Sequence, residues 1–214
     1  MKPYYEDDAV TIYHGDALEV GEWLTADVLL TDPPYGINYR TGGRRLEGNA
    51  RSIEGDKDTA GRDIALSLWS GPALVFGTWK VPAPVGERTR LVWDQDGALG
   101  MGDLSLPWKP SWQMIHVIGG PWAGTRDCGS VLRCPPVLSV GRVHPHEKPL
   151  KLIGMLLAKC VDGTVADPFM GSGSTLVAAK ARGRKAIGIE IDERYCEIAA
   201  RRLDQGVLDL GGAG

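Results

Sequence analysis

Four residues that could carry chemistry stand together where an apolar run ends: Asp32, Pro33, Pro34 and Tyr35 directly follow Val28–Thr31. Because proline cannot donate to a sheet ladder, two in succession should lead the chain out of a strand along a stiff, extended path. Fixed acceptors on that path, the Asp32 carboxylate and the Pro33 carbonyl, could bind both N–H groups of an aromatic amine and favour a nucleophilic nitrogen. The Tyr35 ring would offer a stacking face. A plain strand-ending turn is the alternative interpretation.

A second group follows the run Val165–Ala166, and it reads Asp167-Pro168-Phe169-Met170-Gly171-Ser172-Gly173-Ser174-Thr175. Glycines after a strand let the backbone turn tightly and approach a ligand, and Glu190, ending the next predicted strand, could accept both ribose hydroxyls. The pattern therefore favours an adenosine-containing cofactor. The third glycine of the dinucleotide pattern is absent and no Gly-Lys-Ser/Thr follows, which weakens nicotinamide and nucleoside-triphosphate readings. A simple strand-to-helix turn stays open.

Seven short apolar runs bounded by turn residues predict buried strands. They are Val10–Tyr13, Val28–Thr31, Ala73–Phe76, Arg90–Trp93, Met114–Ile118, Val165–Ala166 and Ala186–Ile189. Helical spacing predicts amphipathic helices over 150–160 and from Asp192 onward. This alternation predicts an α/β fold with a mostly parallel sheet covered by helices on both faces. Ligands of such sheets bind beyond the carboxyl ends of the strands, where both motifs stand.

Length and composition set the outer limits. A chain of 214 residues can form one well-buried α/β domain, so we expect a single domain over 1–214. It has no apolar run long enough for a membrane helix and no signal peptide, so we expect a cytoplasmic protein. Its four cysteines form no C-x-x-C pair, so we expect reduced thiols and no metal. The net charge of −3 restricts any nucleic-acid surface to a local patch.

In their order, the two motifs resemble those of the β-class amino DNA methyltransferases of restriction–modification systems and phages, whose catalytic motif precedes the cofactor motif. His144–Leu150 is similar to the family's H-P-x-x-K-P segment and Tyr13–Leu18 to its G-D segment. Leu91–Trp93 and Trp112–Ile118 are similar to two of its strands. The resemblance covers most of the chain. It implies a Rossmann-like sheet of seven strands whose last hairpin strand is antiparallel.

The resemblance also implies that S-adenosylmethionine is the cofactor and double-stranded DNA the substrate, with transfer to the exocyclic amino group of a flipped base and no metal. D-P-P-Y is commoner among adenine-N6 enzymes, so adenine is our first expectation and cytosine N4 the alternative. The expected catalytic residues are Asp32, Pro33, Pro34 and Tyr35. The expected cofactor contacts are Asp16, Asp32, Lys148, Asp167, Pro168, Phe169, Gly171, Ser172, Gly173, Thr175 and Glu190, with Asp16 on the adenine and Glu190 on the ribose.

Two arginine-containing stretches are the expected DNA contacts. We expect 36–62 to include a mobile loop that orders on DNA and 119–143 to be a short target-recognition region. The candidate residues are Arg40, Arg44, Arg45, Arg126, Arg133 and Arg142. A region this short departs from full-sized members and could mean a brief recognition sequence, low specificity or reading shared within a homodimer. On charge alone, both stretches could be solvated surface.

Three other functions remain as alternatives. Methylation of RNA or of a protein glutamine poses the same chemical problem, but the motif order disfavours it. A non-catalytic, cofactor-sensing nucleic-acid binder would have no need of all four residues of the catalytic motif. A nicotinamide oxidoreductase gives no reason for Asp-Pro-Pro-Tyr.

Overall fold

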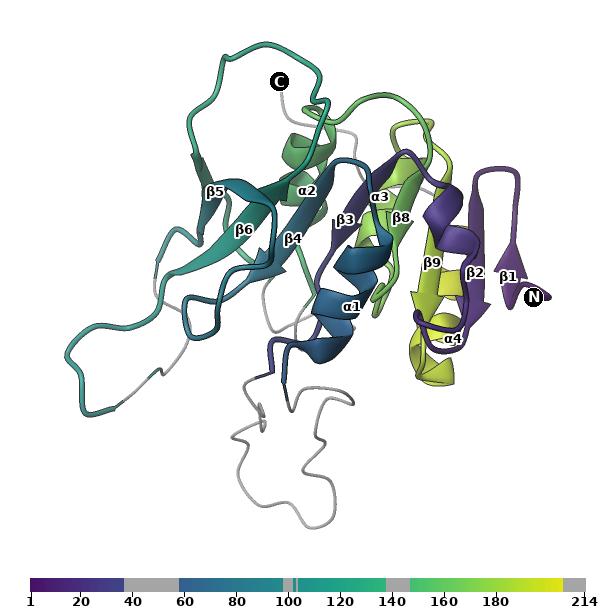
Figure 1. Cartoon of the computed structure of the whole chain (residues 1–214), viewed down its shortest axis with the longest axis horizontal. Coiled ribbons are helices and arrows are strands. Elements are labelled where there is room, and N and C mark those ends of the chain that lie inside the picture. The colour runs from purple at the N-terminus through teal and green to yellow at the C-terminus, as the bar shows by residue number, and fades with distance from the viewer. Residues whose placement is uncertain (37–57, 98–101, 103, 138–146, 206–214) are drawn as a thin grey trace.

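The computed structural model describes residues 1–36, 58–97, 102, 104–137 and 147–205. Within these ranges one sheet has the strand order β1-β2-β9-β8-β3-β4-β6-β5-β7 (Figure 1). The strands are β1 (Tyr5–Glu6), β2 (Val10–His14), β3 (Val28–Thr31), β4 (Ala73–Gly77), β5 (Glu87–Asp94), β6 (Trp112–Ile118), β7 (Val131–Arg133), β8 (Val165–Asp167) and β9 (Ala186–Glu190). All seven predicted strands are confirmed. The expected count of seven was too low, because β1 and β7 are short, partly exposed edge strands without an apolar run.

The sheet is mostly parallel, as predicted. Strands β2, β9, β8, β3 and β4 are parallel to one another in that order. Strand β6 is antiparallel to both β4 and β5, which confirms the expected antiparallel hairpin strand. The carboxyl ends of β3, β4, β5, β8 and β9 and the amino end of β6 therefore meet at one edge, here called the C-terminal edge.

Helices cover both faces of the sheet, which was also predicted (Figure 1). The 3-10 helix η1 (Glu22–Thr25) and α1 (Ala60–Leu68) lie on one face, and α2 (Leu150–Leu157), α3 (Ser174–Lys180) and α4 (Glu193–Asp204) lie on the other. Adjacent residues of β3 point to opposite faces. Leu29 joins the core beneath η1 and α1, and Leu30 joins the larger core beneath α2, α3 and α4. Two apolar layers thus fix β3 from both sides.

Two helix starts bear on the sequence predictions. The Asp192 carboxylate accepts a hydrogen bond from the Arg194 N–H at 3.1 Å, so α4 begins where the sequence predicted. Helix α1 begins at Ala60, inside the stretch expected to include a mobile loop, and Arg62 is buried against the Pro82 carbonyl. Residues 60–62, at the end of that stretch, are therefore helical, and Arg62 packs into the fold.

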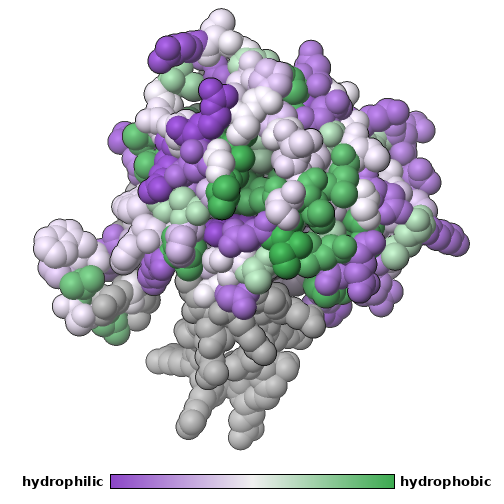
Figure 2. Space-filling view, viewed as in Figure 1, coloured by the Kyte–Doolittle hydropathy of each residue, from purple (hydrophilic) through white to green (hydrophobic). Residues whose placement is uncertain are grey.

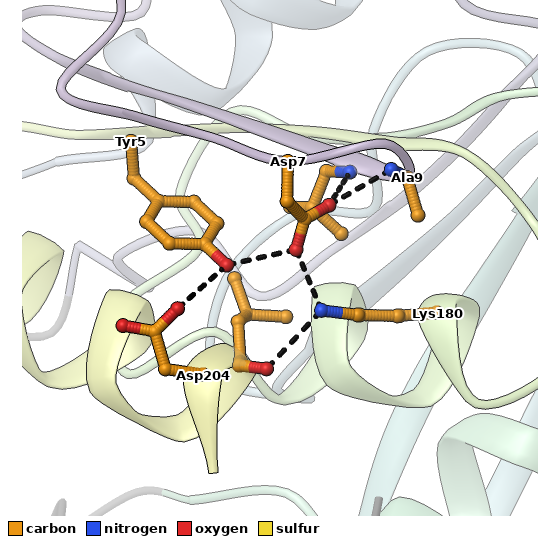
Figure 3. Close-up of polar contacts among 7 residues, drawn as sticks. Tyr5, Asp7, Ala9, Lys180 and Asp204 are labelled. Carbon is orange, nitrogen blue, oxygen red and sulfur yellow. Dashed lines mark hydrogen bonds and ion pairs between the residues drawn. The ribbon is translucent and has the colours of Figure 1, made fainter. Parts of the chain in front are cut away.

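A polar cluster, here called the N-terminal clamp, joins the first strand to α3 and α4 (Figure 3). The Asp7 carboxylate accepts hydrogen bonds from the Ala9 N–H at 2.8 Å and the Lys180 ammonium at 2.6 Å. The Tyr5 hydroxyl lies between the carboxylates of Asp7 and Asp204, at 2.8 and 3.0 Å. Burial raises the pKa of Asp7, but the hydrogen bonds, led by that from Lys180, outweigh it and hold this pKa well below its usual range.

Two further expectations concern the whole chain. No helix in the described ranges is long and apolar enough to cross a membrane. All four cysteine thiols are free, and Cys134, Cys160 and Cys196 are buried whereas Cys128 is exposed.

Candidate active site

The predicted catalytic motif begins where β3 ends, at the C-terminal edge. One Asp32 carboxylate oxygen accepts a hydrogen bond from the Tyr35 hydroxyl at 2.5 Å. The same hydroxyl accepts a hydrogen bond from the Gln113 side-chain amide, near the start of β6, at 2.8 Å. Pro33 is buried and Pro34 is partly buried, which fits a stiff exit from the strand. The motif is therefore a braced structure rather than a free turn, and Gln113 is a brace that sequence reasoning missed.

Lys148 reaches the same carboxylate from a distant part of the chain. Its ammonium contacts the second oxygen of Asp32 and lies 4.8 Å from the centre of the Phe76 ring. The Lys148 side chain is 8% exposed and that of Asp32 is 24% exposed, so solvent screens this ion pair only in part. The sequence led us to expect Lys148 at the cofactor. The structure places it on Asp32, which is among both the expected catalytic residues and the expected cofactor contacts.

Asp167 connects the two motifs. It ends β8, the strand beside β3, and its carboxylate accepts hydrogen bonds from the Thr31 hydroxyl at 2.7 Å and the Phe169 N–H at 3.2 Å. Burial raises the pKa of Asp167 to about 7, and the negative charge of Asp32 contributes in the same direction, although the bonds from Thr31 and Thr175 act against it. Two carboxylates with different environments thus lie side by side at the C-terminal edge.

The glycine turn after β8 is held against the end of β9 by Glu190. One Glu190 carboxylate oxygen accepts a hydrogen bond from the Gly171 N–H and the other from the Asp192 N–H, each at 2.9 Å. Burial raises the pKa of this carboxyl. Gly173 has a φ of +78°, and a Cβ atom there would lie 2.8 Å from the Cβ of Ala199 in α4. This position therefore requires glycine both for its backbone conformation and for the close approach of α4.

The group at the ends of β8, β9 and β2 fits an adenosine-containing ligand. An ionised carboxylate has more acceptor sites than the two that Glu190 uses, so each oxygen can also accept a ribose hydroxyl. Apolar surface lies close by, since Phe169 is partly buried and Ile191 is 46% exposed. Asp16 follows β2, the strand paired with β9, and its carboxylate accepts a hydrogen bond from the Leu18 N–H at 2.9 Å. The structure thus brings the expected cofactor residues to one edge, where Lys148 contacts Asp32.

Arg202 of α4 is a second buried charge that sequence reasoning missed. Its guanidinium donates to the Ser172 carbonyl at 2.7 Å and the Ser172 hydroxyl at 3.1 Å. It also forms an ion pair with Glu147 at 2.7 Å, and the two side chains are 15% and 9% exposed. Burial lowers the pKa of Arg202. An arginine in a run of charged residues on an amphipathic helix looks like surface, so only the fold could identify this contact.

The candidate DNA contacts are not all on the same side of the molecule. Arg133 ends β7 at the C-terminal edge, is 73% exposed and contacts Asp94 at 3.1 Å. Arg126 lies in the loop before β7, where Trp122 pairs with Cys160 ahead of β8, so this loop lies at the opposite edge of the sheet. Arg40, Arg44, Arg45 and Arg142, with most of 36–62 and the end of 119–143, lie outside the described residues.

Comparison with known proteins gives the chain its family. The sequence profile of the DNA methylase family matches residues 108–201. The DNA adenine methyltransferase YhdJ of Escherichia coli (strain K12) is 46% identical over 256 aligned residues, which cover 94% of this chain and 84% of YhdJ. The type II methyltransferase M.ScaI of Streptomyces caespitosus is 28% identical over 268 aligned residues, which cover 98% of this chain and 86% of M.ScaI.

Solved structures share the fold. The cytosine-N4-specific PvuII DNA methyltransferase superimposes with a TM-score of 0.71 at 18% identity, covering 99% of this chain and 91% of that one. The complex of M1.HpyAVI with SAM superimposes with a TM-score of 0.65 at 22% identity, covering 90% of this chain and 99% of M1.HpyAVI. The fold is thus that of the Rossmann-like methyltransferases. The chain belongs to the amino DNA methyltransferases, the S-adenosylmethionine-dependent enzymes that methylate adenine N6 or cytosine N4.

Proposed function

We propose that this chain methylates the N6 amino group of an adenine that is flipped out of double-stranded DNA. The observation that carries this proposal is the Asp32 carboxylate, braced by Tyr35 at the end of β3 and adjacent through Thr31 to Asp167 at the cofactor motif. Aspartate rather than serine at the first motif position supports adenine, as does the description of YhdJ as a DNA adenine methyltransferase. Cytosine N4 is the alternative, and the PvuII enzyme acts there on the same fold.

The cofactor would lie across the ends of β8 and β9. Glu190 would accept the ribose hydroxyls, the turn from Asp167 to Thr175 would wall the ligand, and Asp16 would reach the adenine. When bound, S-adenosylmethionine supplies a methyl group on a positively charged sulfur. The acidic residues at this edge would stabilise that positive charge.

Asp32 and Pro33 would hold the target amino group. The Asp32 carboxylate and the Pro33 carbonyl accept its two N–H groups, and the Tyr35 ring supplies the stacking surface for the base. As the nitrogen gains positive charge, its interaction with Asp32 becomes stronger. The interaction therefore stabilises the transition state more than the bound substrate. Because Lys148 contacts the outer oxygen of Asp32, the incoming amino group must share or displace that ammonium.

The test is incubation of the protein with unmethylated DNA and methyl-labelled S-adenosylmethionine, followed by digestion to nucleosides and mass spectrometry. Labelled N6-methyladenine is the expected product, and Asp32→Ala should abolish it while cofactor binding persists. Lys185→Ala, an exposed lysine just before β9 on the opposite edge, is the control and should retain activity. Label in N4-methylcytosine would instead identify cytosine as the target base. The absence of label, with normal cofactor binding, would contradict the proposal and favour a non-catalytic binder.

A further inference from the structure

Two exposed tryptophan–lysine pairs stand at the C-terminal edge of the sheet. Trp79-Lys80 follows the end of β4, and Trp108-Lys109 precedes the start of β6. Trp79 is 69% exposed and Trp108 is 77% exposed. Both lysines are exposed, and within the part of the chain that the structure describes neither ammonium has a hydrogen bond or ion pair. We call the two pairs the tryptophan–lysine rim.

Each pair stands on an element that also braces the candidate active site. Phe76, whose ring lies under the Lys148 ammonium, is in β4 shortly before Trp79. Gln113, which donates to the Tyr35 hydroxyl, is in β6 shortly after Trp108. The segment between β5 and β6 projects from the body of the molecule (Figure 1), and Figure 2 shows apolar surface on this projection. Both pairs therefore stand at the same edge of the sheet as the site and outside it.

The composition of the rim fits a nucleic acid. Exposed indoles are costly to leave in water, and they stack well on the faces of bases. Lysines pair with phosphates without regard to sequence. Two unpaired lysines at one edge also give a local positive surface on a chain whose net charge is −3. DNA with a base flipped out exposes the faces of its neighbouring bases, so it presents both partners at the required place.

We propose that the tryptophan–lysine rim grips DNA around the flipped base, with the indoles on unstacked bases and the lysines on phosphates. The proposal rests on the proposed function, because DNA must be the substrate. It adds Trp79, Lys80, Trp108 and Lys109 as binding residues. The indoles stabilise the opened duplex by stacking on its unstacked bases. It also places the grip on the edge opposite Arg126.

The test compares Trp79→Ala, Trp108→Ala, Lys80→Ala and Lys109→Ala with Lys185→Ala, an exposed lysine just before β9 on the opposite edge, as the basic control. Affinity for a duplex carrying 2-aminopurine at the target base is measured by anisotropy, and flipping is followed by the fluorescence of that base. Each tryptophan variant should weaken binding about tenfold and reduce the flipping signal. Each lysine variant should weaken binding to all sequences and reduce the salt slope by about 1. The control should change neither quantity.

Cofactor affinity serves as the folding check, since the rim lies outside the cofactor residues. Wild-type DNA affinity in the Trp79→Ala/Trp108→Ala double variant, with normal cofactor affinity, would overturn the rim. A wild-type dimer that becomes monomeric in that variant would assign the surface to a second copy of the chain, and this too would overturn it. Failure of the proposed function is distinguishable, because the wild-type protein itself would then give no labelled N6-methyladenine in DNA.

Discussion

The Lys148 ammonium lies against the Asp32 carboxylate, although 116 positions separate the two residues in the sequence. The ammonium also rests on the face of Phe76. A catalytic carboxylate with a buried cationic partner is held in one orientation before any substrate arrives.

This contact predicts a separation of catalysis from cofactor binding. Lys148→Met should lower kcat for DNA methylation by about tenfold to a hundredfold, because Asp32 loses its orienting partner, while the Kd for S-adenosylmethionine changes less than threefold. Lys148→Arg should restore part of the loss. Steady-state kinetics and calorimetry measure the two quantities, with Lys151→Met on the exposed face of α2 as the control. A loss of cofactor affinity equal to the loss of kcat would instead favour the cofactor role expected from the sequence.

Glu190 gives the reverse separation. Glu190→Ala should weaken cofactor binding by about tenfold to a hundredfold, because it removes a charged acceptor and the partner of the Gly171 N–H. Glu197→Ala, an exposed carboxylate on α4, is the matched control and should leave the Kd unchanged. Calorimetric titration with S-adenosylmethionine measures both, and equal affinities in the two variants would remove Glu190 from the cofactor site.

The raised pKa of Asp167 predicts an unusual pH dependence. The folded protein holds a proton on Asp167 up to a pKa of about 7, whereas the unfolded chain releases it near the ordinary aspartate pKa of 3.8. The free energy of unfolding should therefore fall as the pH rises from about 4 to 7 and then level off. Asp167→Asn should remove this component. Urea unfolding of the cofactor-free protein across that pH range measures it, and parallel curves for the two proteins would contradict the prediction.

The N-terminal clamp predicts the opposite sign. Asp7 has a lowered pKa in the folded protein, so its contribution to stability is present above the unfolded pKa and is lost as the pH falls through the folded one. Asp7→Asn should reduce the free energy of unfolding at pH 7 by about 1–2 kcal/mol, and the difference from wild type should shrink in acid. Asp8→Asn, its exposed neighbour, is the control in the same unfolding experiments. A constant difference at every pH would show that charge is not responsible.

The sequence could predict what depends on local patterns. Apolar runs located seven of the nine described strands, and because parallel strands end at the same edge, Asp32, Asp167 and Glu190 were expected to meet there. The contacts across that edge could not be predicted, because they depend on the order of strands in space. Gln113 reaches Tyr35 only because β6 enters the sheet antiparallel beside β4. Arg126 was grouped with Arg133 by nearness in sequence, yet the short strand β7 carries the chain from one edge to the other.

The ion pair between Arg202 and Glu147 connects the last described helix to the candidate active site. Arg202 grips the Ser172 carbonyl with one nitrogen and Glu147, next to Lys148, with another. Helix α4 therefore supports both segments, although Arg202 contacts neither Asp32 nor Lys148 among the described residues. A truncation or insertion that displaced the helix would loosen the glycine turn and the Lys148 segment together. A change in this helix would then disturb the proposed binding sites of the cofactor and of the target base together.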